Sequence, residues 1–106
     1  MLFRSAKLLA VQTHGRGMAV GQKNAAGITR AQSSEVGFDF AIAEECGRYH
    51  ECDRYTSVYG DHVIAIEYRR KDFRKTCDSV GGQISVVLRD RLVSKPGSKR
   101  YVYDSC

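Results

Sequence analysis

Four short apolar runs, each ending in polar or charged residues, constrain the fold of this chain most. They lie at residues 17–24, 38–44, 62–68 and 83–90, so they begin about 20 residues apart. Near-continuous apolar strands with helix-like connectors are typical of a parallel sheet covered on both faces. The pattern therefore predicts an α/β fold with about four parallel βα units and right-handed crossovers.

The connecting segments support this interpretation. Helical spacing of apolar residues predicts a helix over 2–14, a loop and short helix over 25–35, a helical turn over 54–60 and a helix over 70–79, followed by a polar tail after residue 90. The 106 residues suffice for one domain. A complete α/β barrel needs about 250 residues, so barrel signals here describe only part of a barrel.

Polar side chains gather where the four predicted strands end. They are Lys23 and Asn24, Glu44 and Glu45, Glu67, and Arg89 and Asp90. Because the carboxyl ends of parallel strands meet at one edge of a sheet, we expect these side chains to converge there as a site for acid/base chemistry. Glu44 and Glu45 point to opposite sides of their strand, and the pattern does not say which enters a cleft. Asp39, inside the second run, is interpreted as a structural ion-pair or hydrogen-bond partner.

Four cysteines favour disulfides and an oxidising, secreted context, with three pairings open. The cysteines are Cys46, Cys52, Cys77 and Cys106. Zinc held by three of them together with His50 is the alternative, but the ligand spacing departs from that of ordinary zinc sites. We therefore expect no metal and no other cofactor.

Composition and charge exclude several classes of protein. Hydrophobic residues make up 42% and charged residues 27% of the chain, which indicates a globular fold. No apolar run reaches the roughly 20 residues of a membrane span, and Arg4 and Lys7 interrupt the start, so we expect an amphipathic helix there and no signal peptide or membrane partner. The net charge is +5, but the basic residues are scattered apart from 69–75 and 95–100. A nucleic-acid-binding module using residues 69–75 is thus a minor alternative, and we expect no nucleic-acid partner.

Five separated motifs give the chain a family resemblance. The segments Gly17–Asn24, Phe38–Cys46, Tyr49–Cys52, Ile64–Tyr68 and Phe73–Cys77 resemble, in the same order, motifs of glycoside hydrolase family 114. Members are endo-α-1,4-polygalactosaminidases with a TIM-barrel, (β/α)8 fold. The resemblance implies that residues 1–106 form the C-terminal half of such a barrel, from the helix before the fifth strand through the eighth strand, with no second domain. It also implies a polysaccharide partner and, for full-length members, secretion.

The resemblance implies roles for particular residues. Glu44 matches the glutamate of the family's Asn-Glu-Gln-Cys segment and would be the general acid/base, although Ala43 and Glu45 replace its Asn and Gln neighbours. Positions that line the family's cleft correspond to Lys23, Asn24, Glu67 and Tyr68. Arg89, at the end of the last apolar run, completes the predicted substrate-binding set.

The family's Asp-Asn motif, which carries the nucleophile on an earlier strand, is not found in this sequence. A retaining glycosidase needs two carboxyl groups about 5 Å apart, so the chain is expected to hold half a site and to be inactive alone. Half a barrel leaves an apolar face exposed, which predicts a missing N-terminal half, a gene fragment, or self-association. A non-catalytic carbohydrate-binding or vestigial protein is the alternative function.

Overall fold

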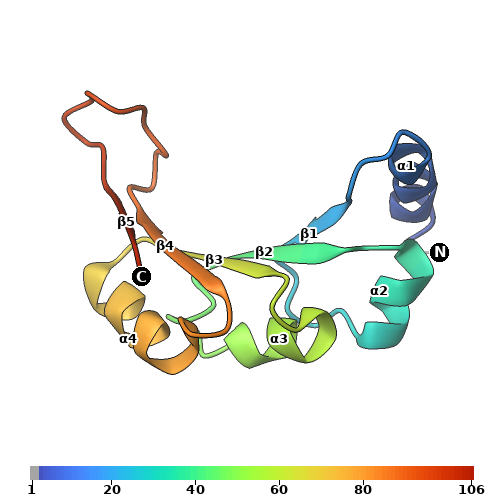
Figure 1. The fold of residues 1–106 in the computed structure, drawn as a ribbon, viewed down its shortest axis with the longest axis horizontal. Helices are drawn as coiled ribbons and strands as arrows, with labels where there is room; N and C mark the ends of the chain where they lie inside the picture. The colour runs from blue at the N-terminus through green and yellow to red at the C-terminus, as the bar shows by residue number, and fades with distance from the viewer. Residues whose placement is uncertain (1–2) are drawn as a thin grey trace.

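The computed structural model describes residues 3–106 as nine helices and strands in nearly regular alternation (Figure 1). They are α1 (Arg4–Gly15), β1 (Gly21–Lys23), α2 (Arg30–Val36), β2 (Phe40–Glu44), α3 (Cys52–Tyr59), β3 (Val63–Glu67), α4 (Arg70–Val80), β4 (Ser85–Arg89) and β5 (Tyr103–Ser105). The four strands and four helical segments predicted from the sequence are all present. Leu2, which the predicted first helix includes, lies outside the described residues.

The strands form one sheet in the order β1-β2-β3-β4-β5. The first four are parallel, and β5 pairs with β4 in the antiparallel direction. The prediction of an α/β fold built from about four parallel βα units is therefore confirmed. The fifth strand was not predicted, because three residues in a polar tail carry no usable pattern.

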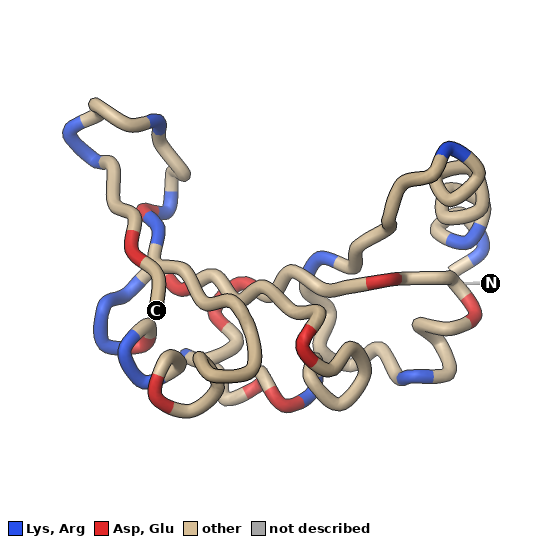
Figure 2. The backbone as a smooth tube through the Cα atoms, in the orientation of Figure 1, with Lys and Arg blue, Asp and Glu red and all other residues tan. Residues whose placement is uncertain are grey.

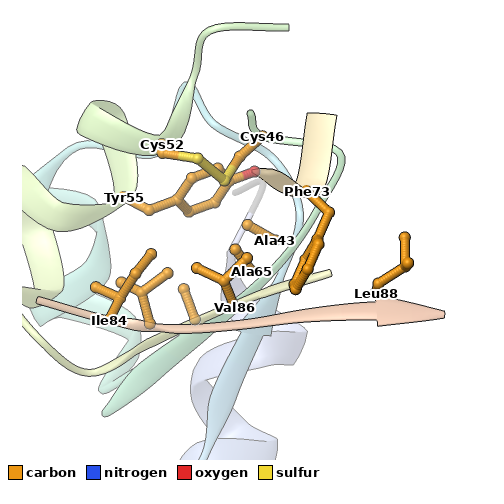
Figure 3. Packing of buried hydrophobic residues seen from close by; sticks show 11 residues of the cluster. Ala43, Cys46, Cys52, Tyr55, Ala65, Phe73, Ile84, Val86 and Leu88 are labelled. Carbon is orange, nitrogen blue, oxygen red and sulfur yellow. A yellow bond between two sulfur atoms is a disulfide. The ribbon is translucent and has the colours of Figure 1, made fainter. Parts of the chain in front are cut away.

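Strand alternation divides the sheet into a covered face and an open face. Helix α3 packs against β2 and β3, and α4 packs against β3 and β4 (Figure 1). The strand residues buried under these helices are Ala41, Ala43, Val63, Ala65, Val86 and Leu88 (Figure 3). The small alanines let the helices approach the sheet closely. Ile42, Ile64 and Val87 alternate with them and face the other side, where Ile64 is 39% exposed.

Capping interactions fix the two ends of α2, and side-chain contacts join the segment before β1 to the start of β2. Thr29 and Gln32 form a capping box at the start of α2, and Gly37 ends that helix in the left-handed conformation. His14 Nε2 lies 2.8 Å from Asp39 Oδ2, and the same oxygen accepts a hydrogen bond of 2.7 Å from the Val20 amide. Asp39 is therefore the structural partner that the sequence predicted.

Two disulfides join the four cysteines, Cys46 to Cys52 and Cys77 to Cys106. The first closes the loop that follows β2, and the second ties the residue after β5 to α4. This pairing settles which of the three possible connectivities this fold adopts.

Basic residues do not form the single stripe that a nucleic-acid-binding module would need. Figure 2 shows them spread over residues 3–106, with those of α1 at one end of the molecule and those of α4 and of the arm between β4 and β5 at the other. Within the segment 69–75, Arg69 pairs with Asp72, and Arg70 lies 3.2 Å from Asp104. The geometry therefore gives no support to the nucleic-acid alternative.

Candidate active site at the carboxyl end of the sheet

Glu44, the last residue of β2, is the centre of a hydrogen-bonded cluster on the open face. The Tyr68 hydroxyl donates to Glu44 Oε1 over 2.7 Å, and Asn24 Nδ2 donates to Oε2 over 3.0 Å. Lys23 Nζ lies 3.7 Å from Oε1. The Glu44 side chain remains 32% exposed, so its carboxyl group is accessible. The structure thus brings four of the predicted site residues together, namely Lys23, Asn24, Glu44 and Tyr68.

Asn24 is positioned by its backbone as well as by its side chain. It follows β1 directly with a φ of 61°, a left-handed conformation that asparagine tolerates better than most residues. Its amide N–H donates to the carbonyl of Ile42 over 2.9 Å, and its Oδ1 accepts from the Glu44 amide over 2.8 Å. Asn24 therefore holds both the backbone and the carboxyl group of Glu44.

The cluster favours the ionised form of Glu44. Hydrogen bonds from Tyr68 and then Asn24, with the charge of Lys23, lower the pKa of Glu44 despite partial burial. Burial and the hydrogen bond to Glu44 raise the pKa of Tyr68 to about 12. At neutral pH the site thus presents a carboxylate that accepts a hydrogen bond from a neutral phenol.

Glu45 lies at the same edge, but basic residues neutralise it. Its carboxylate is 2.8 Å from Arg48 Nη1 and 3.3 Å from Arg91 Nη1, and its side chain is 14% exposed. The hydrogen bond from Arg48 is the main cause of the lowered pKa of Glu45. Arg91 also lies 5.1 Å from the centre of the Tyr68 ring. Sequence reasoning missed Arg48 and Arg91, because loop residues carry no strand-end signal.

The structure does not place Glu67 on the open face beside Glu44, as the sequence predicted, but on the helix-covered side of the sheet. In the register, Glu44 lies opposite Ile66, and Glu67 therefore points to the helix-covered side. Its side chain is fully buried, and Oε2 accepts a hydrogen bond of 2.8 Å from the Gly47 amide. Burial raises the pKa of Glu67.

Arg89 is committed to the arm between β4 and β5. Its Nε donates to the carbonyl of Val102 over 3.0 Å, and its Nη2 donates to the carbonyl of Ser94 over 2.9 Å. Its guanidinium also lies 5.4 Å from the centre of the Tyr101 ring. The structure does not bring Arg89 to Glu44 as predicted, and its contacts instead hold the arm in place.

The cysteines offer no zinc site in this structure. Sulfur atoms of Cys46 and Cys52 lie within 4.8 Å of a Glu67 carboxylate oxygen, but the two sulfurs are bonded to each other. Zinc binds thiolates, which a disulfide does not supply. The zinc alternative, which also needed Cys77, is overturned because Cys77 is bonded to Cys106.

A separate pocket of about 700 Å³ lies at the opposite, amino-terminal ends of the strands. Its lining includes Phe38, Asp39, His62 and Ser85. Asp39 already serves as a structural partner of His14, whereas catalytic groups of α/β barrels lie at the carboxyl ends of the strands. The Glu44 cluster at the carboxyl ends is therefore the better candidate.

Comparisons with known proteins identify the family of the chain. The alternating βα units and the mostly parallel sheet define an α/β domain, and the sequence model of glycoside-hydrolase family GH114 matches residues 2–106. The chain belongs to glycoside-hydrolase family GH114. A search of curated proteins found no match. In the part of the chain that the structure describes, no helix has the length and apolar character needed to cross a membrane.

One solved structure matches the fold over nearly the whole chain. It is the crystal structure of Aspergillus fumigatus Ega3 in complex with galactosamine, and it matches with a TM-score of 0.71 and 22% sequence identity. The match covers 95% of this chain and 43% of the Ega3 chain. This chain therefore has the architecture of part of a TIM-barrel structure and spans less than half the length of that protein.

Proposed function

We propose that the chain is the C-terminal half of a glycoside hydrolase barrel that cleaves α-1,4-galactosaminidic bonds in a galactosamine-rich polysaccharide, with Glu44 as the proton-transfer residue. The observation that carries the proposal is the cluster of Glu44, Asn24 and Tyr68 at the carboxyl end of the parallel strands. Active sites of α/β barrels lie at this end. Lys23 and the donors of Asn24 and Tyr68 border the space that a sugar would occupy.

The lowered pKa of Glu44 implies that the proposed reaction needs a second carboxylate. An acid catalyst must hold a proton before it can pass it to the leaving oxygen, yet the contacts of Glu44 lower its pKa. A second carboxylate about 5 Å away would raise that pKa by charge repulsion and would attack the anomeric carbon. Glu45 is neutralised and Glu67 is buried, so neither serves. The proposed nucleophile therefore belongs to the part of the barrel that this chain does not span.

The proposed substrate class rests on the family and on the complex that Ega3 forms with galactosamine. The two disulfides agree with function in an oxidising, extracellular environment. Both features are consistent with a secreted enzyme that acts on a polysaccharide.

The role of Glu44 can be tested with the chain as it stands. The wild type, Glu44→Gln and the control Glu35→Gln, an exposed glutamate of α2, are incubated with galactosamine oligosaccharides with and without added formate, and products are measured by mass spectrometry. Formate is a small carboxylate that can take the place of the absent nucleophile. We expect little or no cleavage without formate, and formate-dependent cleavage by the wild type and Glu35→Gln but not by Glu44→Gln. Formate-dependent cleavage by Glu44→Gln at the rate of the wild type would contradict the assignment.

A non-catalytic carbohydrate-binding role is the second candidate. Unlike Glu45 and Glu67, Glu44 is accessible and has no arginine partner among residues 3–106, so its carboxylate is available to a sugar. Calorimetric titration with the same oligosaccharides separates the two functions. Binding without cleavage under every condition supports the second function and counts against the first.

A further inference from the structure

The buried carboxyl group of Glu67 lies against the turn that follows β2. Its Oε2 accepts the hydrogen bond from the Gly47 amide, and the Arg48 amide also favours its charged form. Its Oε1 is buried and has no hydrogen-bond partner among the described residues. A buried carboxyl group without a cationic partner is retained at a cost in stability, so a specific task for it is worth seeking.

The turn fits tightly onto Glu67 and α4. A Cβ atom placed on Gly47 would overlap Thr76 Oγ1 and would lie 3.0 Å from Glu67 Oε2. Thr76 is itself 1% exposed, and its hydroxyl donates to the carbonyl of Asp72 over 2.6 Å. Neither neighbour has room to move away, so the backbone of the turn is fixed from the covered side of the sheet.

The same turn leads directly out of the candidate active site. The Glu45 amide donates to the carbonyl of Ile66 over 2.7 Å, and Glu45 has a φ of 59°, which reverses the chain immediately after Glu44. On the neighbouring strand, Glu67 stands between Ile66 and Tyr68, the residue whose hydroxyl holds Glu44. Glu67 is thus linked to Glu44 by two routes, the turn after β2 and the backbone that carries Tyr68.

From these contacts we propose that Glu67 is a positioning residue for the Glu44 site. It holds the Gly47 amide and thereby fixes the turn, while its buried side chain fixes the backbone from which Tyr68 reaches Glu44. The inference rests on the proposed function for its catalytic meaning, but the geometry it asserts can be measured without any substrate.

The test compares Glu67→Gln with Glu67→Met. Glutamine keeps an oxygen that accepts from the Gly47 amide, whereas methionine fills a similar volume and offers only a weakly accepting sulfur. NMR spectroscopy measures hydrogen exchange of the Gly47 amide and the titration of the Glu44 carboxyl carbon. We expect Glu67→Gln to behave like the wild type. In Glu67→Met we expect at least tenfold faster exchange at Gly47 and a Glu44 pKa that moves up toward its ordinary value.

Two further variants separate positioning from general destabilisation. Val86→Ala weakens the core at a residue that is 2% exposed in β4, away from the turn, and is expected to leave the Glu44 titration unchanged. If Glu67→Met does not fold, Glu67→Asp, which is one methylene shorter, takes its place with the same expectations. The proposal is overturned if the Gly47 exchange rate and the Glu44 pKa are unchanged in Glu67→Met, or in Glu67→Asp where that variant takes its place. It is also overturned if the Glu44 pKa shifts equally in Val86→Ala. Failure of the cleavage experiment alone leaves these readouts intact, so the two proposals fail separately.

Discussion

Replacing Tyr68 with phenylalanine removes one hydrogen bond from the candidate site and little else. The lost bond is the 2.7 Å contact from the Tyr68 hydroxyl to Glu44 Oε1, the largest cause of the lowered pKa of Glu44. A hydrogen bond to a charged group contributes about 1.5–3 kcal/mol to stability. Because the Glu44 side chain is 32% exposed, water replaces part of the interaction, and we expect a loss of about 1 kcal/mol at pH 7.

The effect must depend on pH with a definite sign. The pKa of Glu44 is lower in the folded than in the unfolded chain, so the ionised carboxylate stabilises the fold above its unfolded pKa of about 4.3. That stabilisation disappears as the pH falls through the folded pKa. The difference in free energy of unfolding between the wild type and Tyr68→Phe should therefore be largest near neutral pH and shrink steadily below about pH 4.

Urea unfolding from pH 7 down to pH 3 measures this difference, with Tyr49→Phe as the matched control. Tyr49 is 57% exposed, so loss of its hydroxyl should change stability little at any pH. A difference for Tyr68→Phe that stays constant with pH would show that the ionised form of Glu44 is not what Tyr68 stabilises. A Glu44 pKa that does not rise in the variant would refute the reasoning independently.

Three further predictions test the framework around the site. Replacing Cys77 and Cys106 with alanine opens a loop with a sequence separation of 29 and should lower the free energy of unfolding by about 3.5 kcal/mol in urea titrations. Replacing Cys46 and Cys52, whose separation is 6, should lower it by only about 2 kcal/mol, because a shorter loop restricts the unfolded chain less. A larger loss for the shorter loop would contradict this argument. Gly47→Ala forces a Cβ into a threonine hydroxyl of α4 and should cost about 2 kcal/mol or more by the same assay, whereas Gly82→Ala, with nothing within 4 Å, serves as control. Asp90→Ala removes the acceptor of two arm amides, at 2.9 and 3.2 Å, so trypsin should cleave the arm faster than in the wild type, and equal rates would show that other contacts hold it.

The sequence predicted the strands well because a buried parallel strand has a strong local signature. The run 62–68 is mostly apolar and carries a carboxylate, Glu67, next to its end, and the observed strand is Val63–Glu67. Convergence of the strand ends on one edge then follows from parallel pairing alone. That inference correctly brought Lys23, Asn24 and Glu44 together.

The sequence could not predict the register between neighbouring strands. A shift of one residue moves every side chain of a strand to the other face of the sheet. Glu44 lies opposite Ile66, and this pairing places Glu67 under the helices and Tyr68 at the open side. Arg89 lies away from Glu44 for a different reason, because its partners are backbone carbonyls of an irregular arm that has no periodic signal.

Three glutamates that look equivalent in the sequence have three different electrostatic environments. Glu67 has a raised pKa because it is buried without a cation, and Glu45 is ionised and neutralised by two arginines. Glu44 is ionised but held mainly by neutral donors, which stabilise its charge without cancelling it. A second carboxylate placed near this accessible group would raise its pKa by charge repulsion, whereas arginines surround Glu45 and the fold buries Glu67. This difference, and not the position at a strand end, is the reason why we propose Glu44 as the proton-transfer residue.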